Sequence, residues 1–185
     1  KIANTVGHFE HFLSRSPIFK NIKLELPAIS AKNAHAEIYM SDANELVKNI
    51  KCDVAYIDPP YNGRQYVNFY HVLENLARWE KPKEFEGVSM KFKRNNLKSD
   101  YSKSKAPLVF RNLIDNLKAK LIIVSYNNTY SAKSTASNNK ISEKEVEQIL
   151  KGRGEIIEIK SFDHKFFNSG KTNFKKHKEN LYICK

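Results

Sequence analysis

The stretch Asp53–Tyr61, with the sequence DVAYIDPPY, decides the fold of this chain. Its first five residues are typical of a β-strand, and Pro59 and Pro60 end that strand because proline lacks a backbone N–H and fixes φ. Asp58, the Pro59 carbonyl and Tyr61 then offer two acceptors and a flat ring at the carboxyl end of the strand. Ligands bind at this end of the strands in open α/β sheets, so the loop is the first candidate site.

Outward from this strand, helix and strand patterns alternate through most of the chain. Ahead of it we predict a helix over 1–15, a strand over 36–40, and a helix opened by a capping box of Asp42 and Glu45. Behind it we predict helices over 66–79, 106–119 and 142–152, and strands over 121–124, 155–160 and 181–184. This alternation predicts an α/β fold with a largely parallel sheet and an antiparallel strand at the C-terminal end.

Length and composition restrict the class of protein. The chain has 185 residues, which suits one domain, and its 41% hydrophobic and 28% charged residues are typical of a globular protein. No stretch approaches the roughly 18 uncharged apolar residues of a membrane span, so no membrane partner is predicted. Cys52 and Cys184 lack metal-ligand spacing, so no metal site is predicted.

The net charge of +12 is concentrated in two segments. Residues 81–105 carry eight Lys or Arg against three Asp or Glu, and residues 160–178 carry six against one. Such an excess favours a polyanionic partner, with nucleic acid ahead of a membrane surface. The second segment interleaves its lysines with phenylalanines, which suits a groove that tracks phosphates and stacks bases. The alternative is a pair of solvated loops whose phenylalanines turn into the core.

Beyond these patterns, AYIDPPYNGRQY at residues 55–66 resembles the catalytic motif of DNA adenine-N6 methyltransferases, which use S-adenosylmethionine. YHVLENLARWEKP at 70–82, LIIVSYNN at 121–128 and ENLYICK at 179–185 are similar to the D12 class of these enzymes. More narrowly, they resemble members that modify sites for type II restriction systems. The resemblance covers the chain from about Asn4 onward. It implies an incomplete Rossmann-like S-adenosylmethionine-dependent methyltransferase fold, double-stranded DNA as the partner, and a cytoplasmic bacterial enzyme.

The resemblance makes Asp58, Pro59, Pro60 and Tyr61 the catalytic loop. Adenine N6 is a poor nucleophile because its lone pair is delocalised into the ring, and acceptors at the Asp58 carboxylate and the Pro59 carbonyl would localise that pair. These acceptors strengthen as positive charge develops on the nitrogen. A target base inside a duplex must be flipped out. Tyr61 would stack on that base, a contact of roughly 1–3 kcal/mol. The alternative is a structural turn in which Asp58 caps a neighbouring residue.

The resemblance also implies that Asp42 contacts the adenine amine of the cofactor, although the same residue suits a helix N-cap. The glycine-rich strand-to-helix turn that would hold the methionine end of the cofactor is absent, since Gly152–Gly154 follows a helix and leads into a strand. We therefore expect a single partial catalytic domain over 1–185, with a preceding segment or a second chain completing the cofactor site and an exposed hydrophobic sheet edge.

The remaining candidates face DNA or the target base. Arg64 could hold a phosphate of the flipped strand or pair with a helix carboxylate, and Tyr66 follows it closely. Asn127 ends a strand and could line the base pocket or simply turn the chain. Phe166 and Phe167 could stack on the other face of the base, although core packing is the alternative. Two other functions stay open: an RNA base methyltransferase, and a non-enzymatic nucleic-acid-binding remnant.

Overall fold

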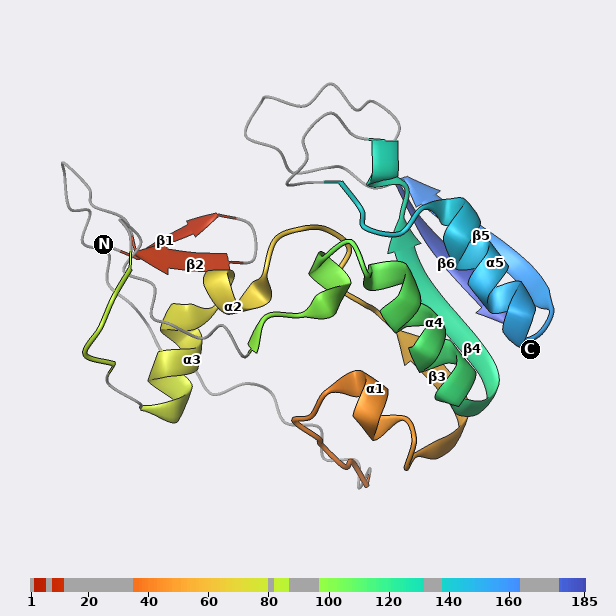
Figure 1. Ribbon diagram of the computed structural model, residues 1–185, viewed down its shortest axis with the longest axis horizontal. Helices are drawn as coiled ribbons and strands as arrows, with labels where there is room; N and C mark the ends of the chain where they lie inside the picture. The colour runs from red at the N-terminus through yellow and green to blue at the C-terminus, as the bar shows by residue number, and fades with distance from the viewer. Residues whose placement is uncertain are drawn as a thin grey trace.

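The computed structural model shows a four-stranded sheet with two long helices side by side on one of its faces (Figure 1). The structure describes residues 2–5, 8–11, 35–79, 82–86, 97–131, 138–163 and 177–185. The strands are β3 (Lys51–Ile57), β4 (Lys118–Asn127), β5 (Ile156–Asp163) and β6 (Lys178–Cys184). The helices are α4 (Ala106–Asn116) and α5 (Glu143–Arg153). All six elements were predicted from the sequence, and each strand is longer than its predicted core.

The strand order is β3-β4-β6-β5, and the sheet is mixed. β3 pairs with β4 in parallel, whereas β6 pairs antiparallel with both β4 and β5. The predicted antiparallel C-terminal strand is therefore confirmed. The expectation of a largely parallel sheet is wrong for the described residues, because β6 is inserted between β4 and β5. β5 consequently has no parallel neighbour, although it runs in the same direction as β3 and β4.

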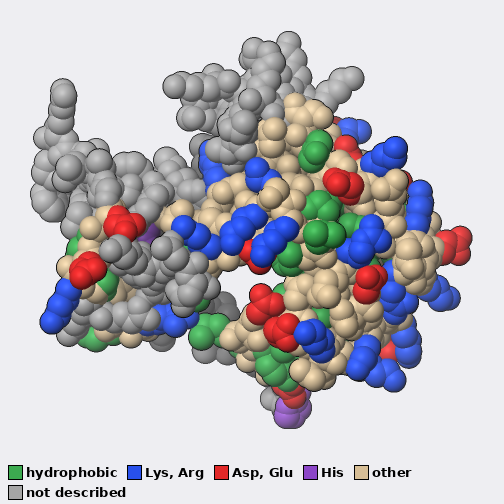
Figure 2. All heavy atoms as spheres, in the orientation of Figure 1, with side chains coloured by type: hydrophobic (Ala, Val, Ile, Leu, Met, Phe, Trp, Pro, Cys, Tyr) green, Lys and Arg blue, Asp and Glu red, His purple; other side chains and the backbone are tan. Residues whose placement is uncertain are grey.

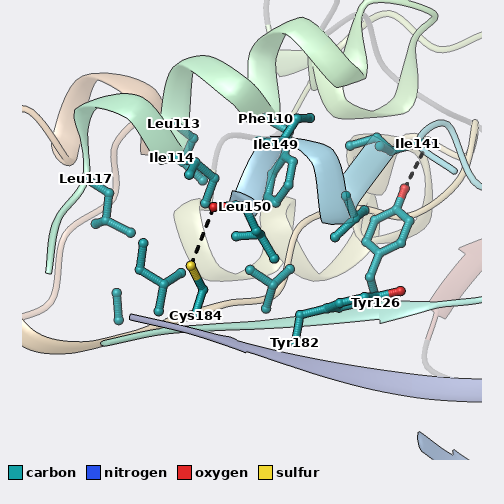
Figure 3. Close-up of a cluster of buried hydrophobic side chains, with 14 of the residues drawn as sticks. Phe110, Leu113, Ile114, Leu117, Tyr126, Ile141, Ile149, Leu150, Tyr182 and Cys184 are labelled. Carbon is teal, nitrogen blue, oxygen red and sulfur yellow. Dashed lines mark hydrogen bonds between the residues drawn. The ribbon is translucent and has the colours of Figure 1, made fainter. Parts of the chain in front are cut away.

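The core lies between the two helices and this face of the sheet (Figure 3). Phe110 and Ile114 of α4 and Leu150 of α5 are fully buried against Val124 and Tyr182 of the sheet. Inward-facing positions on β4 and β6 are opposite one another in register, so their side chains form one continuous apolar floor. Burying side chains of this size contributes roughly 1.5–3 kcal/mol each, which makes the helix-sheet layer the main source of stability.

Helix α5 begins at the capping box predicted from the sequence. The Ser142 hydroxyl accepts a hydrogen bond from the Glu145 N–H at 3.2 Å, and the Glu145 carboxylate accepts one from the Ser142 N–H at 2.8 Å. The helix ends at Arg153, with Gly154 as the C-cap. A Cβ atom at Gly154 would lie 2.0 Å from the Lys185 carbonyl oxygen, so this close approach of two backbones requires glycine.

The N-terminal residues form strands where we predicted a helix. β1 (Ile2–Thr5) and β2 (His8–His11) pair antiparallel, with Val6 and Gly7 between them in sequence. The apolar spacing fits a helix, but glycine costs about 1 kcal/mol in a helix interior and favours the tight connection of a hairpin. The backbone of β2 lies beside α2 (Tyr66–Phe69) and α3 (His71–Arg78), away from the main sheet (Figure 1).

The helix predicted over 66–79 is interrupted at Tyr70, whose φ of −103° and ψ of 9° leave the helical region. The His71 imidazole lies 2.9 Å from the Asn68 carbonyl oxygen and hydrogen-bonds to it. That carbonyl would otherwise accept a backbone N–H of a continuous helix, so the side chain competes with the backbone at this point. The result is two shorter helices that meet at an angle.

No described strand pairs with the outer edge of β3. Val54 and Tyr56, which alternate with buried Ala55, are 54% and 59% exposed, so the face of β3 that carries them is apolar and largely uncovered by the described residues. The strand predicted over 36–40 is wrong: these residues form no regular structure, and Ile38 is 94% exposed. A strand needs a ladder partner, and none of the described segments supplies one. None of the described helices has the length and apolar character needed to span a membrane.

Candidate active site

The loop after β3 is fixed to the strand beside it. Asp58 is exposed, Pro59 is buried and Tyr61 is half-buried at the carboxyl end of β3. The Tyr61 carbonyl accepts hydrogen bonds from the Lys140 N–H at 2.8 Å and from the Tyr126 hydroxyl at 3.3 Å. The Tyr61 ring packs edge-on against Tyr126, with ring centroids 5.1 Å apart. The loop therefore holds one conformation while the Asp58 carboxylate faces solvent.

Three side chains converge on the hydroxyl of Tyr61. This oxygen lies 2.7 Å from Asp58 Oδ1, 2.9 Å from Glu179 Oε1 and 3.1 Å from Ser125 Oγ. Ser125 also donates a hydrogen bond to Glu179 Oε1 at 2.7 Å. Burial raises the pKa of Tyr61 well above its ordinary value, and Asp58 and Glu179 raise it further against the opposing effect of Ser125. The phenol is therefore a neutral donor at physiological pH.

The segment after the loop is tied to η2 (Asp100–Ser102), a short 3-10 helix. The Gln65 carboxamide forms two hydrogen bonds with the backbone of Ser99, donating to its carbonyl at 2.9 Å and accepting from its N–H at 2.7 Å. Arg64 is exposed, and its backbone N–H donates to Asn62 Oδ1 at 3.0 Å. Burial, followed by the charge of Asp58, raises the pKa of Tyr66, so Tyr66 lies within electrostatic range of the loop.

A cavity of about 810 Å³ brings the predicted cofactor residue and the predicted catalytic loop together. Asp42 lines it from the start of α1 (Ala43–Leu46), and Asp58 and Pro59 line it from the end of β3. Arg78 at the end of α3 and Tyr101 of η2 also line it. Figure 2 shows the surface hollowed near the centre of this face, with Lys and Arg side chains along the rim.

Asp42 is the N-cap of α1, as one of its two predicted roles requires. Its Oδ1 accepts hydrogen bonds from the Asn44 N–H at 2.9 Å and from the Glu45 N–H at 3.3 Å. The predicted capping box is only half formed, because the Glu45 carboxylate pairs with Lys48 at 2.7 Å instead of reaching back. Burial, followed by the charge of Asp42, raises the pKa of Tyr101. The Asp42 carboxylate therefore stands at the wall of the cavity with its position set by the helix.

The comparison with known families identifies the chain at this point. The family model described as "D12 class N6 adenine-specific DNA methyltransferase" matches residues 1–129, which is more than half of the chain. The chain belongs to this D12 class. The DPPY loop and the Asp42 segment both lie within the matched region.

Curated relatives of this D12 chain are named as methylases. "Modification methylase StsI" of Streptococcus sanguinis is 38% identical over 96% of this chain and 26% of the relative. "Type II methyltransferase M.NlaIII" of Neisseria lactamica is 32% identical over 97% of this chain and 51% of the relative. "Type II methyltransferase M.FokI" of Planomicrobium okeanokoites is 31% identical over 83% of this chain and 23% of the relative. The chain thus spans a quarter to a half of their lengths. No solved structure matches it.

In the D12 chain, Asn127 takes part in the turn that follows β4. Its side-chain oxygen accepts hydrogen bonds from the Thr129 N–H at 3.1 Å and from the Thr129 hydroxyl at 2.7 Å. The Asn139 side chain donates to the Asn127 carbonyl. Asn127 is buried, so its carboxamide shapes the end of the strand from within. Phe166 and Phe167 lie outside the described residues.

The described parts of the two basic segments are 82–86, 97–105, 160–163 and 177–178. Lys98 lines the cavity. Lys103 and Lys105 each pair with Asp100 at 2.7 Å, and these two bonds hold the pKa of Asp100 below its ordinary value. Part of the positive charge of the first segment is thus balanced locally, at exposed positions where ion pairs contribute little to stability.

No role at this site was predicted for Glu179, which opens the ENLYICK stretch at 179–185. Its partners Tyr61 and Ser125 are 118 and 54 residues away in sequence, so only the pairing of β6 with β4 reveals the contact. Ser125 and Glu179 lie in the LIIVSYNN and ENLYICK stretches that carry the resemblance, which is the sequence signal that could have identified both. The structure brings them together because the carboxyl end of β4 lies beside the amino end of the antiparallel β6.

Proposed function

We propose that this chain is the catalytic portion of a type II restriction-modification methyltransferase that methylates adenine N6 in DNA. Membership of the D12 class and the names of the relatives support this proposal. The single observation that carries it is the cavity that joins Asp42 to Asp58 and Pro59. Asp42 would contact the adenine amine of the cofactor, and Asp58 would contact the amine of the target adenine. One cavity therefore has an acidic group at both places.

The proposed chemistry follows from the loop. Asp58 Oδ1 accepts the Tyr61 hydroxyl at 2.7 Å, and Oδ2 accepts no hydrogen bond from any described residue. Oδ2 and the Pro59 carbonyl can therefore accept the two N–H bonds of a flipped adenine amine. Positive charge that develops on the amine nitrogen during methyl transfer would be stabilised by both acceptors. The proton that the amine loses would pass to the solvent that the exposed Asp58 carboxylate faces.

S-adenosylmethionine, when bound, would supply the electrophilic methyl group. The cavity fits such a ligand because Asp42 supplies an acceptor for its adenine amine and Asp58 supplies negative charge toward its sulfonium. Leu46, Val47 and Leu113 supply apolar walls beside these two carboxylates. The carboxylate of Asp42 can serve both purposes, because Oδ1 caps the helix and Oδ2 accepts no hydrogen bond from a described residue.

We propose that the sheet is part of an incomplete Rossmann-like fold. The uncovered edge of β3 and the partial coverage of the relatives support a completing segment, or a second chain, that adds to this edge and supplies the glycine-rich turn. A bacterial cytoplasm is the compartment in which such an enzyme meets its DNA. Duplex DNA would contact residues 81–105 and 160–178, and its affinity should fall steeply with salt as counterions are released.

Methyl transfer by the enzyme reconstituted with its completing segment tests this function. Asp58→Ala should lower the rate by a factor on the order of 10²–10³ and leave duplex affinity unchanged. Asp53→Ala is the matched control, since Asp53 lies on the strand that leads into the loop, is 80% exposed and pairs only with Lys120 among the described residues. Preference for a ribosomal RNA fragment over an adenine-containing duplex would refute the DNA assignment. Near wild-type turnover by the Asp58 variant would refute the mechanism.

A further inference from the structure

We propose that Glu179 is a positioning residue for the catalytic loop. It would act through the Tyr61 hydroxyl, which it holds together with Ser125 so that the phenol keeps Asp58 in place. The inference rests on the proposed function, in which Asp58 accepts a hydrogen bond from the target amine. The contacts that carry it are measurable in the protein without any substrate.

The count of hydroxyl protons explains how the four side chains are arranged. Tyr61 and Ser125 have one hydroxyl proton each, and ionised Asp58 and Glu179 only accept. Ser125 lies 2.7 Å from Glu179, and Tyr61 lies closer to Asp58, at 2.7 Å, than to Glu179, at 2.9 Å. Ser125 therefore donates its proton to Glu179, and the phenolic proton of Tyr61 is shared between Asp58 and Glu179.

The strands place Glu179 and Ser125 rigidly. Glu179 is opposite Asn127 in the β4–β6 register, and Ser125 lies two residues before Asn127, so both side chains project from one face of the sheet. Ser125 is buried and Glu179 is half-buried, so little solvent competes for their hydrogen bonds. Two paired strands thus fix the point to which the Tyr61 hydroxyl is attached.

Asp58 depends on this attachment because it is exposed at the end of a loop. Its only hydrogen bond from a described side chain comes from Tyr61. When the Tyr61 oxygen is held, Asp58 Oδ1 is occupied and Oδ2 keeps the orientation that the target amine needs. Catalytic groups must be held within about 0.5 Å of their productive position, so loss of this support should lower turnover more than binding.

A double-mutant cycle between Glu179 and Tyr61 tests the proposal. Glu179→Ala and Tyr61→Phe, which keeps the aromatic ring, should each lower kcat roughly tenfold, the loss expected for one hydrogen bond in the site. The KM for S-adenosylmethionine should stay unchanged. The double variant should be no slower than either single variant, because both remove the same support. Glu179→Gln keeps an acceptor oxygen and should restore kcat to within about threefold of wild type. Glu158→Ala, a half-exposed glutamate on the same sheet, is the control.

Thermal unfolding of the same variants of this chain provides a second measurement that needs no activity. The shifts in Tm should also be non-additive. If wild type transfers no methyl group to DNA, the proposed function fails, while the Tm cycle still reports whether Glu179 acts through Tyr61. If kcat is unchanged in Glu179→Ala, or if the two effects on kcat multiply, the positioning role is overturned. Additive Tm shifts would overturn the coupling itself.

Discussion

Asp42 allows the two roles of one carboxylate to be separated experimentally. Its Oδ1 caps α1 through the backbone N–H groups of Asn44 and Glu45, and the residue also lines the cavity that contains Asp58. Asp42→Ala removes both functions. Asp42→Ser keeps a capping hydroxyl but is too short to reach a ligand in the cavity. Both variants therefore lose the contact with the ligand, and only Asp42→Ala also loses the helix cap.

The magnitudes follow from the two kinds of contact. Replacing an N-cap by alanine costs about 0.5–2 kcal/mol, and α1 is a short, mostly exposed helix, so we expect about 1 kcal/mol for Asp42→Ala and less than about 0.5 kcal/mol for Asp42→Ser. Loss of a hydrogen bond from a charged group costs about 1.5–3 kcal/mol. Both variants should therefore bind S-adenosylmethionine roughly 10- to 150-fold more weakly.

Urea unfolding of this chain measures the first effect, and calorimetry on the reconstituted enzyme measures the second. Asp42→Ser that binds the cofactor as tightly as wild type would show that the carboxylate is a helix cap alone. Asp42→Ser that is as unstable as Asp42→Ala would show that the cap contributes nothing and that the magnitude was assigned to the wrong contact.

Three further substitutions test packing, capping and charge. Phe110→Ala empties a fully buried position and should lower the free energy of unfolding in urea by about 3–5 kcal/mol. Leu108→Ala, on the same helix and 70% exposed, should lower it little. Equal losses in the two variants would contradict the described core. Ser142→Ala should cost about 1 kcal/mol by removing the α5 cap, and an unchanged urea midpoint would refute this. The lowered pKa of Asp100 means that its ion pairs stabilise the fold above its ordinary pKa and are lost as pH falls through the lowered value. Asp100→Asn should therefore melt below wild type at neutral pH and level with it near pH 2, and a difference that persists in acid would exclude these pairs as its cause.

Local sequence signals predicted the elements whose first or last residues are set by nearby side chains. Pro59 and Pro60 end β3 whatever surrounds them, and Ser142 with Glu145 opens α5 by contacts within one turn. The loop proposed as catalytic carries a local signal of the same kind, since its carboxylate, carbonyl and ring are close together in sequence. Such features depend on neighbours three or four residues away and can be read without knowledge of the fold.

Features that depend on distant partners were missed. The apolar residues near Ile38 fit a strand, yet a strand forms only when another segment offers a ladder. The position of β6 between β4 and β5 is set by the order of strands across the sheet, which no local pattern encodes. Glu179 reaches the site for that same reason, because β6 lies next to β4. Contacts between distant segments, and not local secondary-structure propensity, decide whether and where these segments pair.

The position of β6 also orders the events of synthesis. Among the described strands, β5 connects to the sheet only through β6, so a nascent chain that has emerged as far as Asp163 holds a strand with no partner. Lys178–Cys184 must leave the ribosome before β5 can dock, and the pairing of β6 with the distant β4 is a long-range closure of the kind that slows folding. The same strand brings Glu179 to Tyr61. A polypeptide released early would thus carry the DPPY loop in its sequence and lack both the finished sheet and the support proposed for Asp58.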